Sequence, residues 1–238
     1  MPESIVSSPT MSRSTVAWFG KLPSQGDFVG RRMPHAMVKC WDDWMRCGLD
    51  MLRREAAANW EQRFVHSPLW FFISPAAVMG VPVVGVLAPS VDRVGRYFPI
   101  SVMAVAEQAG SRFASNTAVI RFLSGARDAV INARRLPWSA DQLDAQLAHL
   151  CSPFASDPRA PEHALIDALL ADLHDGELQA AGSNAELPNM DWRAMHGRAS
   201  ETTLWWISPT PAFPRDEVVH HGSLCRPLFV RLFKGNVR

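Results

Sequence analysis

The sequence has little net charge and few cysteines. Its 24 Lys and Arg residues are balanced by 23 Asp and Glu, which leaves a net charge of +1. Proteins that bind nucleic acid present a basic face to the phosphates, so this balance argues against a nucleic-acid partner. The four cysteines, Cys40, Cys47, Cys151 and Cys225, form no CxxC pair. Reduced thiols in a cytoplasmic protein are therefore expected, rather than a disulfide framework.

A membrane-spanning helix is not indicated either. Residues 68–91 carry no charge and are long enough to cross a bilayer, but Pro75, Pro82 and Pro89 interrupt them. Because proline breaks helices, two buried strands joined by a turn at residues 75–80 fit better, and no membrane insertion is expected. Residues 1–14 lack the apolar core of a secretory signal. They are expected to form a disordered lead-in to a single domain at residues 15–238.

Strong catalytic motifs are missing: the sequence has no GxSxG, P-loop, HExxH or GxGxxG pattern. Neither an enzyme nor a cofactor is therefore expected. His220, His221 and Cys225 could supply metal ligands, but no fourth ligand is evident, which favours a polar loop before the last strand. Four carboxylates could also gather in space for acid–base or metal chemistry, although nothing in their spacing requires it: Asp27, Asp42, Asp43 and Asp92.

What the sequence does contain is an alternation of apolar runs and helical patterns. Runs rich in β-branched and aromatic residues predict strands at residues 15–19, 69–73, 81–87, 98–105, 202–207 and 228–233. Apolar residues at helical spacing predict helices at 34–60, 111–134, 139–150 and 162–173. Residues 176–200 and 208–222 are expected to be mostly loop. The interleaved order predicts an α/β fold in which helices cover a mixed, largely antiparallel sheet.

The longest predicted helix carries Trp41 and Trp44 near its apolar stripe. This placement favours packing in the core over a ligand-binding role, and at least one of the two is expected to anchor the core. Cys40 and Cys47 lie two turns apart on the same helix, about 10 Å, which is too far for a disulfide. Both are expected to be small buried hydrophobic side chains.

Two charged loops interrupt the apolar runs. The 20–28 loop (GKLPSQGDF) carries Lys21 and Asp27, and the 90–96 loop (SVDRVGR) carries Asp92, Arg93 and Arg96. In one interpretation, Asp27 caps a local turn and the 90–96 loop is a solvated tip with an Asp92–Arg93 or Asp92–Arg96 ion pair. In the other, the loops lie together, Lys21 and Asp27 meet Asp92 and Arg96, and Arg93 stays free. Such a polar site would either bind a partner or brace the fold.

Residues 18–28 (WFGKLPSQGDF) and 89–99 (PSVDRVGRYFP) resemble the two signature stretches of the TagF family, also called ImpM. Members of this family are accessory proteins of bacterial type VI secretion. Residues 41–44 (WDDW) and 204–206 (LWW) resemble two further family motifs. The resemblance implies a three-layer sandwich with a central sheet between helical layers, and a polar site for binding or bracing. The residues of that site would be Lys21, Gly26, Asp27, Asp42, Trp44, Ser90, Asp92, Arg93, Gly95, Arg96 and Trp205.

The resemblance also implies a function. Family members act in the cytoplasm as post-translational repressors of type VI secretion, and they are thought to bind the forkhead-associated scaffold protein of the system. One alternative is a structural or assembly component of the secretion machine, which the absence of heptad repeats or an assembly tail disfavours. The other alternative is a hydrolase that uses Asp27, Asp92, Arg93 and Arg96, which the absence of a nucleophile–base motif disfavours.

Overall fold

A seven-stranded sheet forms the centre of the molecule. The computed structural model describes residues 15–154, 187–188 and 200–234. The strands follow the order β2-β1-β5-β4-β3-β6-β7, and each neighbouring pair is antiparallel. Their bounds are β1 (Thr15–Gly20), β2 (Val29–Arg31), β3 (Trp70–Ser74), β4 (Val83–Ala88), β5 (Ile100–Val105), β6 (Thr202–Ile207) and β7 (Asp216–His221).

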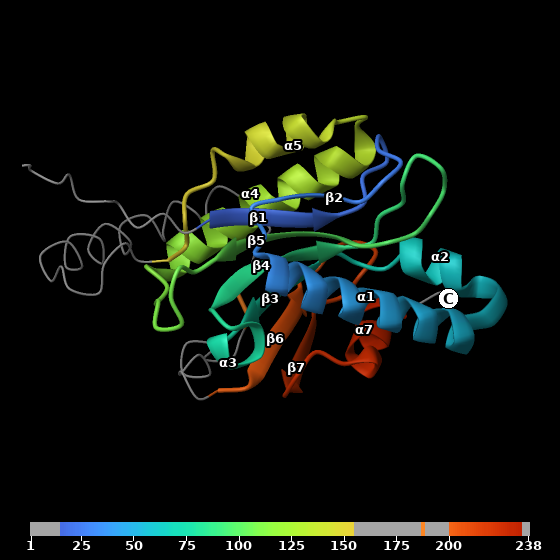
Figure 1. Cartoon of the computed structure of the whole chain (residues 1–238). Helices are drawn as coiled ribbons and strands as arrows, with labels where there is room; N and C mark the ends of the chain where they lie inside the picture. Colours follow the sequence, from blue (N-terminus) through green and yellow to red (C-terminus); the bar gives the residue numbers. More distant parts are fainter. Residues whose placement is uncertain (1–14, 155–186, 189–199, 235–238) are drawn as a thin grey trace, which may run out of the picture.

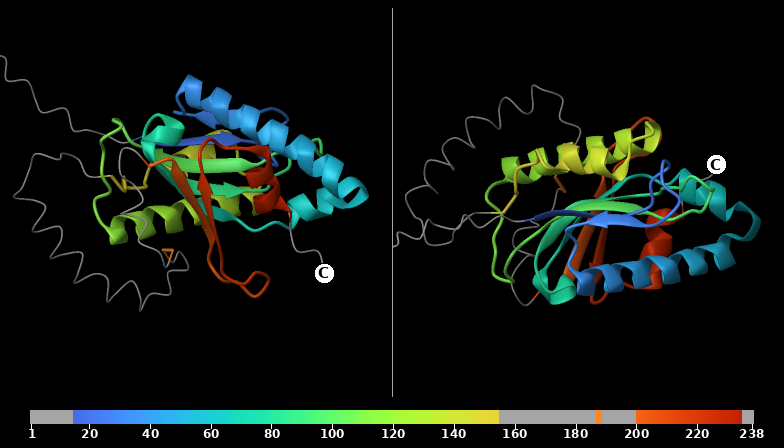
Figure 2. Two further views of the ribbon diagram at one scale, coloured as in Figure 1. Left: turned by 90° about the horizontal axis from the view of Figure 1, so that it is seen from below. Right: turned by 45° about the horizontal axis from the view of Figure 1, so that its top comes forward.

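Helices cover both faces of this sheet (Figures 1 and 2). One face carries α4 (Asn116–Arg135) and α5 (Ala140–Leu147), and the other carries α1 (His35–Ala56), α2 (Trp60–Val65) and α7 (Arg226–Phe233). A short 3-10 helix, η1 (Ala57–Asn59), joins α1 to α2, and α3 (Ala76–Met79) connects β3 to β4. The expected three-layer α/β sandwich is confirmed.

Alternation along the strands divides the core into two halves. On β3, Phe71 and Ile73 pack towards α4 and α5, whereas Trp70 and Phe72 pack towards α1 and α7. Successive side chains of a strand point to opposite faces, so a strand between two helical layers is apolar throughout. This is why the central strands read as unbroken apolar runs in the sequence.

The predictions for β1, β3, β4, β5 and β6 are confirmed within a residue or two. Residues 68–91 contain two buried strands, and none of the described helices is both long and apolar enough to span a membrane. The predicted helix at 139–150 corresponds to α5, which begins with a capping box formed by Ser139 and Gln142. The lead-in at residues 1–14, the helix at 162–173 and most of the loop at 176–200 fall outside the described residues.

Two elements near the C-terminus differ from the expectation. Residues 228–233, predicted as a strand, belong to α7, which has Pro227 in its first turn. The predicted loop at 208–222 contains β7, an edge strand whose residues are only half-buried. Edge strands are often short and polar, so β7 lacks the apolar pattern that marks the central strands.

Helix α1 buries the tryptophans but not the cysteines. Trp41 and Trp44 are both core residues, as predicted. Cys40 and Cys47 are exposed, so the expectation that they are buried is wrong. Cys40 precedes the buried Trp41 by one residue, and one residue rotates a side chain by about 100° around a helix.

Candidate functional site

The sheet brings the 20–28 and 90–96 loops to one end of the molecule. Gly20 on β1 pairs with Ile100 on β5, and Ile100 pairs with Ala88 on β4. The 20–28 loop leaves the sheet at Gly20, and the other loop connects Ala88 to Ile100. Gly20 has a φ of 146°, and a Cβ there would overlap the carbonyl oxygen of Pro99. Only glycine therefore fits this close approach.

Asp92 is the centre of the contacts between the loops. Lys21 Nζ donates to Asp92 Oδ2 at 2.7 Å, and the two side chains are 5% and 0% exposed. Arg96 Nε donates to the same oxygen at 2.7 Å. The other oxygen, Oδ1, accepts from the backbone N–H groups of Val94 (3.0 Å) and Arg96 (2.9 Å). We refer to Lys21, Asp92 and Arg96 as the Asp92 brace.

These contacts set the charge of Asp92. Burial by itself would raise the pKa of the carboxyl group. The hydrogen bonds from Lys21, Arg96 and Val94 favour the ionised form and outweigh burial, so the pKa lies well below its usual range. Asp92 therefore stays negatively charged at neutral pH, and its oxygens already accept from four donors.

Further contacts hold the 20–28 loop against the 90–96 loop. Ser90 Oγ donates to the carbonyl oxygen of Lys21 at 2.8 Å, and the backbone N–H of Arg93 donates to Gln25 O at 2.9 Å. The Arg96 guanidinium donates to the carbonyl oxygen of Gly26. Arg96 also lies 3.8 Å from the carboxylate of Asp27, whose side chain is fully exposed. The loops therefore form one unit.

Beyond this buried contact, the loops present an exposed tip. Arg93 and Gly95 are exposed, and Val94 is 63% exposed. Phe28 is 39% exposed and stacks on Phe19 at 5.8 Å. We call Asp27, Phe28, Arg93, Val94 and Gly95 the loop tip.

Three of the expected site residues lie elsewhere. Trp44 and Trp205 are buried and pack against each other at 5.6 Å, so they belong to the core between α1 and the sheet. Asp42 pairs with Arg46 at 2.6 Å on α1. The Arg46 guanidinium lies 5.3 Å from the ring centre of Phe28, which gives Asp42 an indirect link to the loop tip.

No metal site emerges from the predicted candidates. Cys225 Sγ lies 3.9 Å from His220 Nε2, but the described residues contain no group of three or more metal-ligating side chains. His220 Nε2 lies 2.9 Å from the carbonyl oxygen of Ser223, and His221 Nδ1 lies 2.9 Å from Thr202 Oγ1. His220 and His221 lie on β7 and not in the expected loop, and these contacts hold their side chains at the edge of the sheet.

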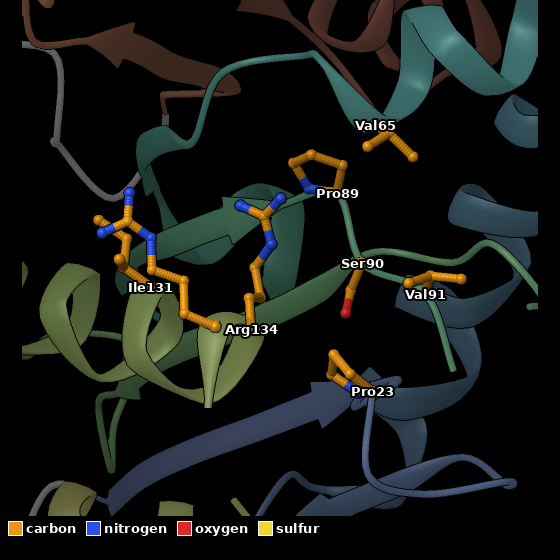
Figure 3. Close-up of a pocket in the computed structure, with 8 residues that line it drawn as sticks. Pro23, Val65, Pro89, Ser90, Val91, Ile131 and Arg134 are labelled. Carbon is orange, nitrogen blue, oxygen red and sulfur yellow. The ribbon is translucent and has the colours of Figure 1, made fainter. Parts of the chain in front are cut away.

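Sequence reasoning missed a cavity behind the loops. It measures about 400 Å³ and lies between the C-terminal end of α4 and both loops (Figure 3). Its lining residues are Pro23, Val65, Pro89, Ser90, Val91, Ile131, Arg134 and Arg135. The sign of this cavity in the sequence was a pair of adjacent arginines, Arg134 and Arg135, at the end of a helix. Positive charges are common at that position because they interact favourably with the helix dipole, so the pair did not by itself indicate a cavity.

This chain is similar to known proteins both in sequence and in fold. The family model described as the TagF N-terminal domain, type VI secretion system-associated, matches residues 17–150, more than half of the chain. The crystal structure of PA0076 from Pseudomonas aeruginosa PAO1 is similar, with a TM-score of 0.64 and 24% sequence identity. That match covers 92% of this chain and 94% of the other, and it supports the fold. No curated protein matches the sequence.

Proposed function

The chain belongs to the TagF family of type VI secretion-associated proteins, and we propose that it is a repressor that acts on this secretion system after translation. In this proposal it is a cytoplasmic accessory protein that binds the forkhead-associated scaffold protein of the system and blocks assembly. The observation that carries the proposal is the family match at residues 17–150, which includes both loops.

The loop tip is the surface that we propose contacts the scaffold protein. The Arg93 side chain makes no ion pair with another described residue, unlike Arg96, and Val94 beside it is largely exposed. Arginine is one of the residue types that most often contribute strongly to protein interfaces. The Asp92 brace lies directly beneath and would hold the tip in one conformation, which lowers the entropy lost on binding.

The low pKa of Asp92 and the hydrogen bonds to both of its oxygens support a binding role over hydrolysis. A general base needs a pKa near the working pH and a free oxygen that can take a proton. The pKa of Asp92 is lowered, and its two oxygens accept hydrogen bonds from Lys21, Arg96 and two backbone N–H groups. We propose that the Asp92 brace is structural and that the protein is not an enzyme.

The function is tested by co-purification and by secretion. The full chain, carrying an affinity tag, is isolated from cells that contain the type VI gene cluster, and we expect the forkhead-associated protein to co-purify. Overproduction of the chain should abolish type VI secretion into the medium, and its deletion should increase secretion. Co-purification of sheath or baseplate proteins alone, with secretion lost on deletion, would instead indicate a structural component.

A further inference from the structure

The cavity at the end of α4 combines positive charge with apolar walls. Figure 3 shows Ile131 and Arg134 on α4 facing Pro89, Ser90 and Val91 across the space, with Val65 and Pro23 at either end. The Ser90 hydroxyl donates to Lys21 O, so the contact between the two loops also fixes this wall. The cavity volume of about 400 Å³ falls within the range of small-molecule sites.

The two arginines lack a counter-charge among the described residues. Arg134 is half-buried, and burial and then the charge of Arg135 lower the pKa of its guanidinium. Arg127, seven residues and about two turns earlier on α4, instead pairs with Asp128 at 2.8 Å. Arg135 is exposed, whereas the half-buried guanidinium of Arg134 lies against apolar walls with a like charge beside it, and a bound anion would offset both of these costs.

The helix dipole explains only part of this arrangement. Cations in the last turn of a helix are stabilised by its unpaired carbonyl groups. That effect acts equally on arginines that point into solvent. It does not account for a cavity that contains Arg134 and Arg135 together with apolar side chains from three other segments.

We propose that this cavity binds an organic phosphate, with Arg134 and Arg135 holding the phosphoryl oxygens. A phosphate monoester carries close to two negative charges at neutral pH and matches both guanidinium groups, whereas a carboxylate would neutralise one. Planar guanidinium groups donate pairs of hydrogen bonds to phosphoryl oxygens. The apolar walls formed by Pro23, Val65 and Pro89 suit the organic part.

Space for a larger organic group exists next to the site. A second cavity of about 480 Å³ also has Ile131 and Arg134 in its lining and continues towards Phe71 and Phe213. The phosphoryl group could therefore belong to a free small molecule, such as a nucleotide, or to a phosphorylated side chain of a protein. Both sources share the same recognition chemistry.

The test uses the purified full chain and phenyl phosphate, titrated by isothermal calorimetry. We expect binding that weakens by about tenfold or more in Arg134→Gln and in Arg135→Gln, since each loses charged hydrogen bonds. Arg121→Gln is the matched control, because Arg121 is exposed on the same helix and does not line the cavity. Benzoate should bind more weakly than phenyl phosphate.

Unchanged binding in the Arg134→Gln, Arg135→Gln double variant would overturn the proposal, as would no binding of phenyl phosphate at millimolar concentration. Melting temperatures of the variants show whether they remain folded. A second titration compares adenosine monophosphate with a phosphotyrosine peptide. Tighter binding of the nucleotide supports a free ligand, tighter binding of the peptide supports a phosphorylated protein, and failure of both overturns the proposal. The assay contains no scaffold protein, so its outcome is independent of the proposed function.

Discussion

The ammonium group of Lys21 lies 2.7 Å from the carboxylate of Asp92, although 71 residues separate them along the chain. Both side chains are buried beneath the exposed loop tip. A buried pair of this kind contributes less to stability than its short distance suggests, because both charges lose their hydration. Its removal is costly only when one charge is left alone, and this asymmetry makes the pair useful for experiment.

Removal of the Asp92 carboxylate should strongly destabilise the protein. Asp92→Ala leaves the buried Lys21 ammonium without a counter-charge and removes an acceptor from the N–H groups of Val94 and Arg96. We expect a loss of about 3–5 kcal/mol in the free energy of unfolding, measured with urea. Asp27→Ala is the control, since that side chain is fully exposed, and it should change stability by about 0.5 kcal/mol or less. Equal effects of the two substitutions would contradict a structural role for the Asp92 brace.

The same carboxylate predicts a dependence of stability on pH. Because the native pKa of Asp92 is depressed, its contribution is fully present above the unfolded-state pKa and is lost as the pH falls towards the native pKa. The difference in unfolding free energy between the natural protein and Asp92→Asn should therefore be constant from neutral pH down to about pH 4 and shrink below it. Denaturation in urea at a series of pH values measures this difference, and a constant difference at all pH values would argue against the shift.

Substitution of Arg93 should weaken binding of the partner without changing the stability of the protein. Its side chain belongs to the loop tip and makes no ion pair with another described residue, so Arg93→Ala should leave the melting temperature unchanged. We expect the affinity for the forkhead-associated protein to fall by about tenfold or more, equivalent to about 1.4 kcal/mol. Arg121→Ala, an exposed arginine on α4, is the control. Full affinity in Arg93→Ala and in Val94→Ala would place the binding surface elsewhere.

Two helical glycines should respond differently to alanine. A Cβ at Gly48 on α1 would overlap the Phe229 ring and its Cβ, whereas a Cβ at Gly125 on α4 would meet a terminal methyl group of Leu150. Alanine favours a helix by about 1 kcal/mol over glycine. The Leu150 methyl group can move aside, so Gly125→Ala should be near neutral. Gly48→Ala should lose about 1–3 kcal/mol through overpacking. Thermal unfolding of both variants tests this contrast.

Trp41 should be more important for stability than Trp60. Trp41 is fully buried, packs against Phe72 and donates from Nε1 to Ser101 Oγ at 3.0 Å. Trp41→Ala should therefore cost about 3–5 kcal/mol. Trp60 is only partly buried at the periphery of the same helical layer, and Trp60→Ala should cost clearly less in the same urea titration. A smaller loss of unfolding free energy in Trp41→Ala than in Trp60→Ala would mean that the core beneath α1 tolerates the cavity left by the missing indole ring.

The sequence predicted the central strands because their burial is unambiguous. Residues 83–88 and 100–105 are buried at every position, and such runs can hardly be anything but strands when glycine and proline flank them. The helix α7 could not be distinguished in this way. Five of its eight residues are buried where it packs beside α1 in the same layer, and periodicity alone does not separate a short, mostly apolar helix from a strand. Pro227 in the first turn was the one local signal.

Parts of the site were predictable for a different reason. Opposite charges in two loops, each next to an apolar strand, led to the expectation that Lys21 and Asp92 approach each other, and the structure has them in contact. The family motifs contained Trp44 and Trp205 as well, but sequence similarity does not distinguish a core residue from a surface residue. The cavity at Arg134 was out of reach because it depends on how the end of α4 packs against two distant loops.

The order of the strands has a consequence for how the chain acquires its structure during synthesis. β6 pairs with β3, and α7 packs against α1, yet both elements lie beyond the residues 17–150 that identify the family. A chain released at residue 150 would leave β3 as an unpaired apolar edge and α1 without the Phe229 side chain, both of which promote aggregation. We therefore expect β6 and α7 to fold as one unit with the elements that lie within residues 17–150. On the ribosome, the helical layer that contains α1 cannot close until α7 has been synthesised, because α7 packs against α1.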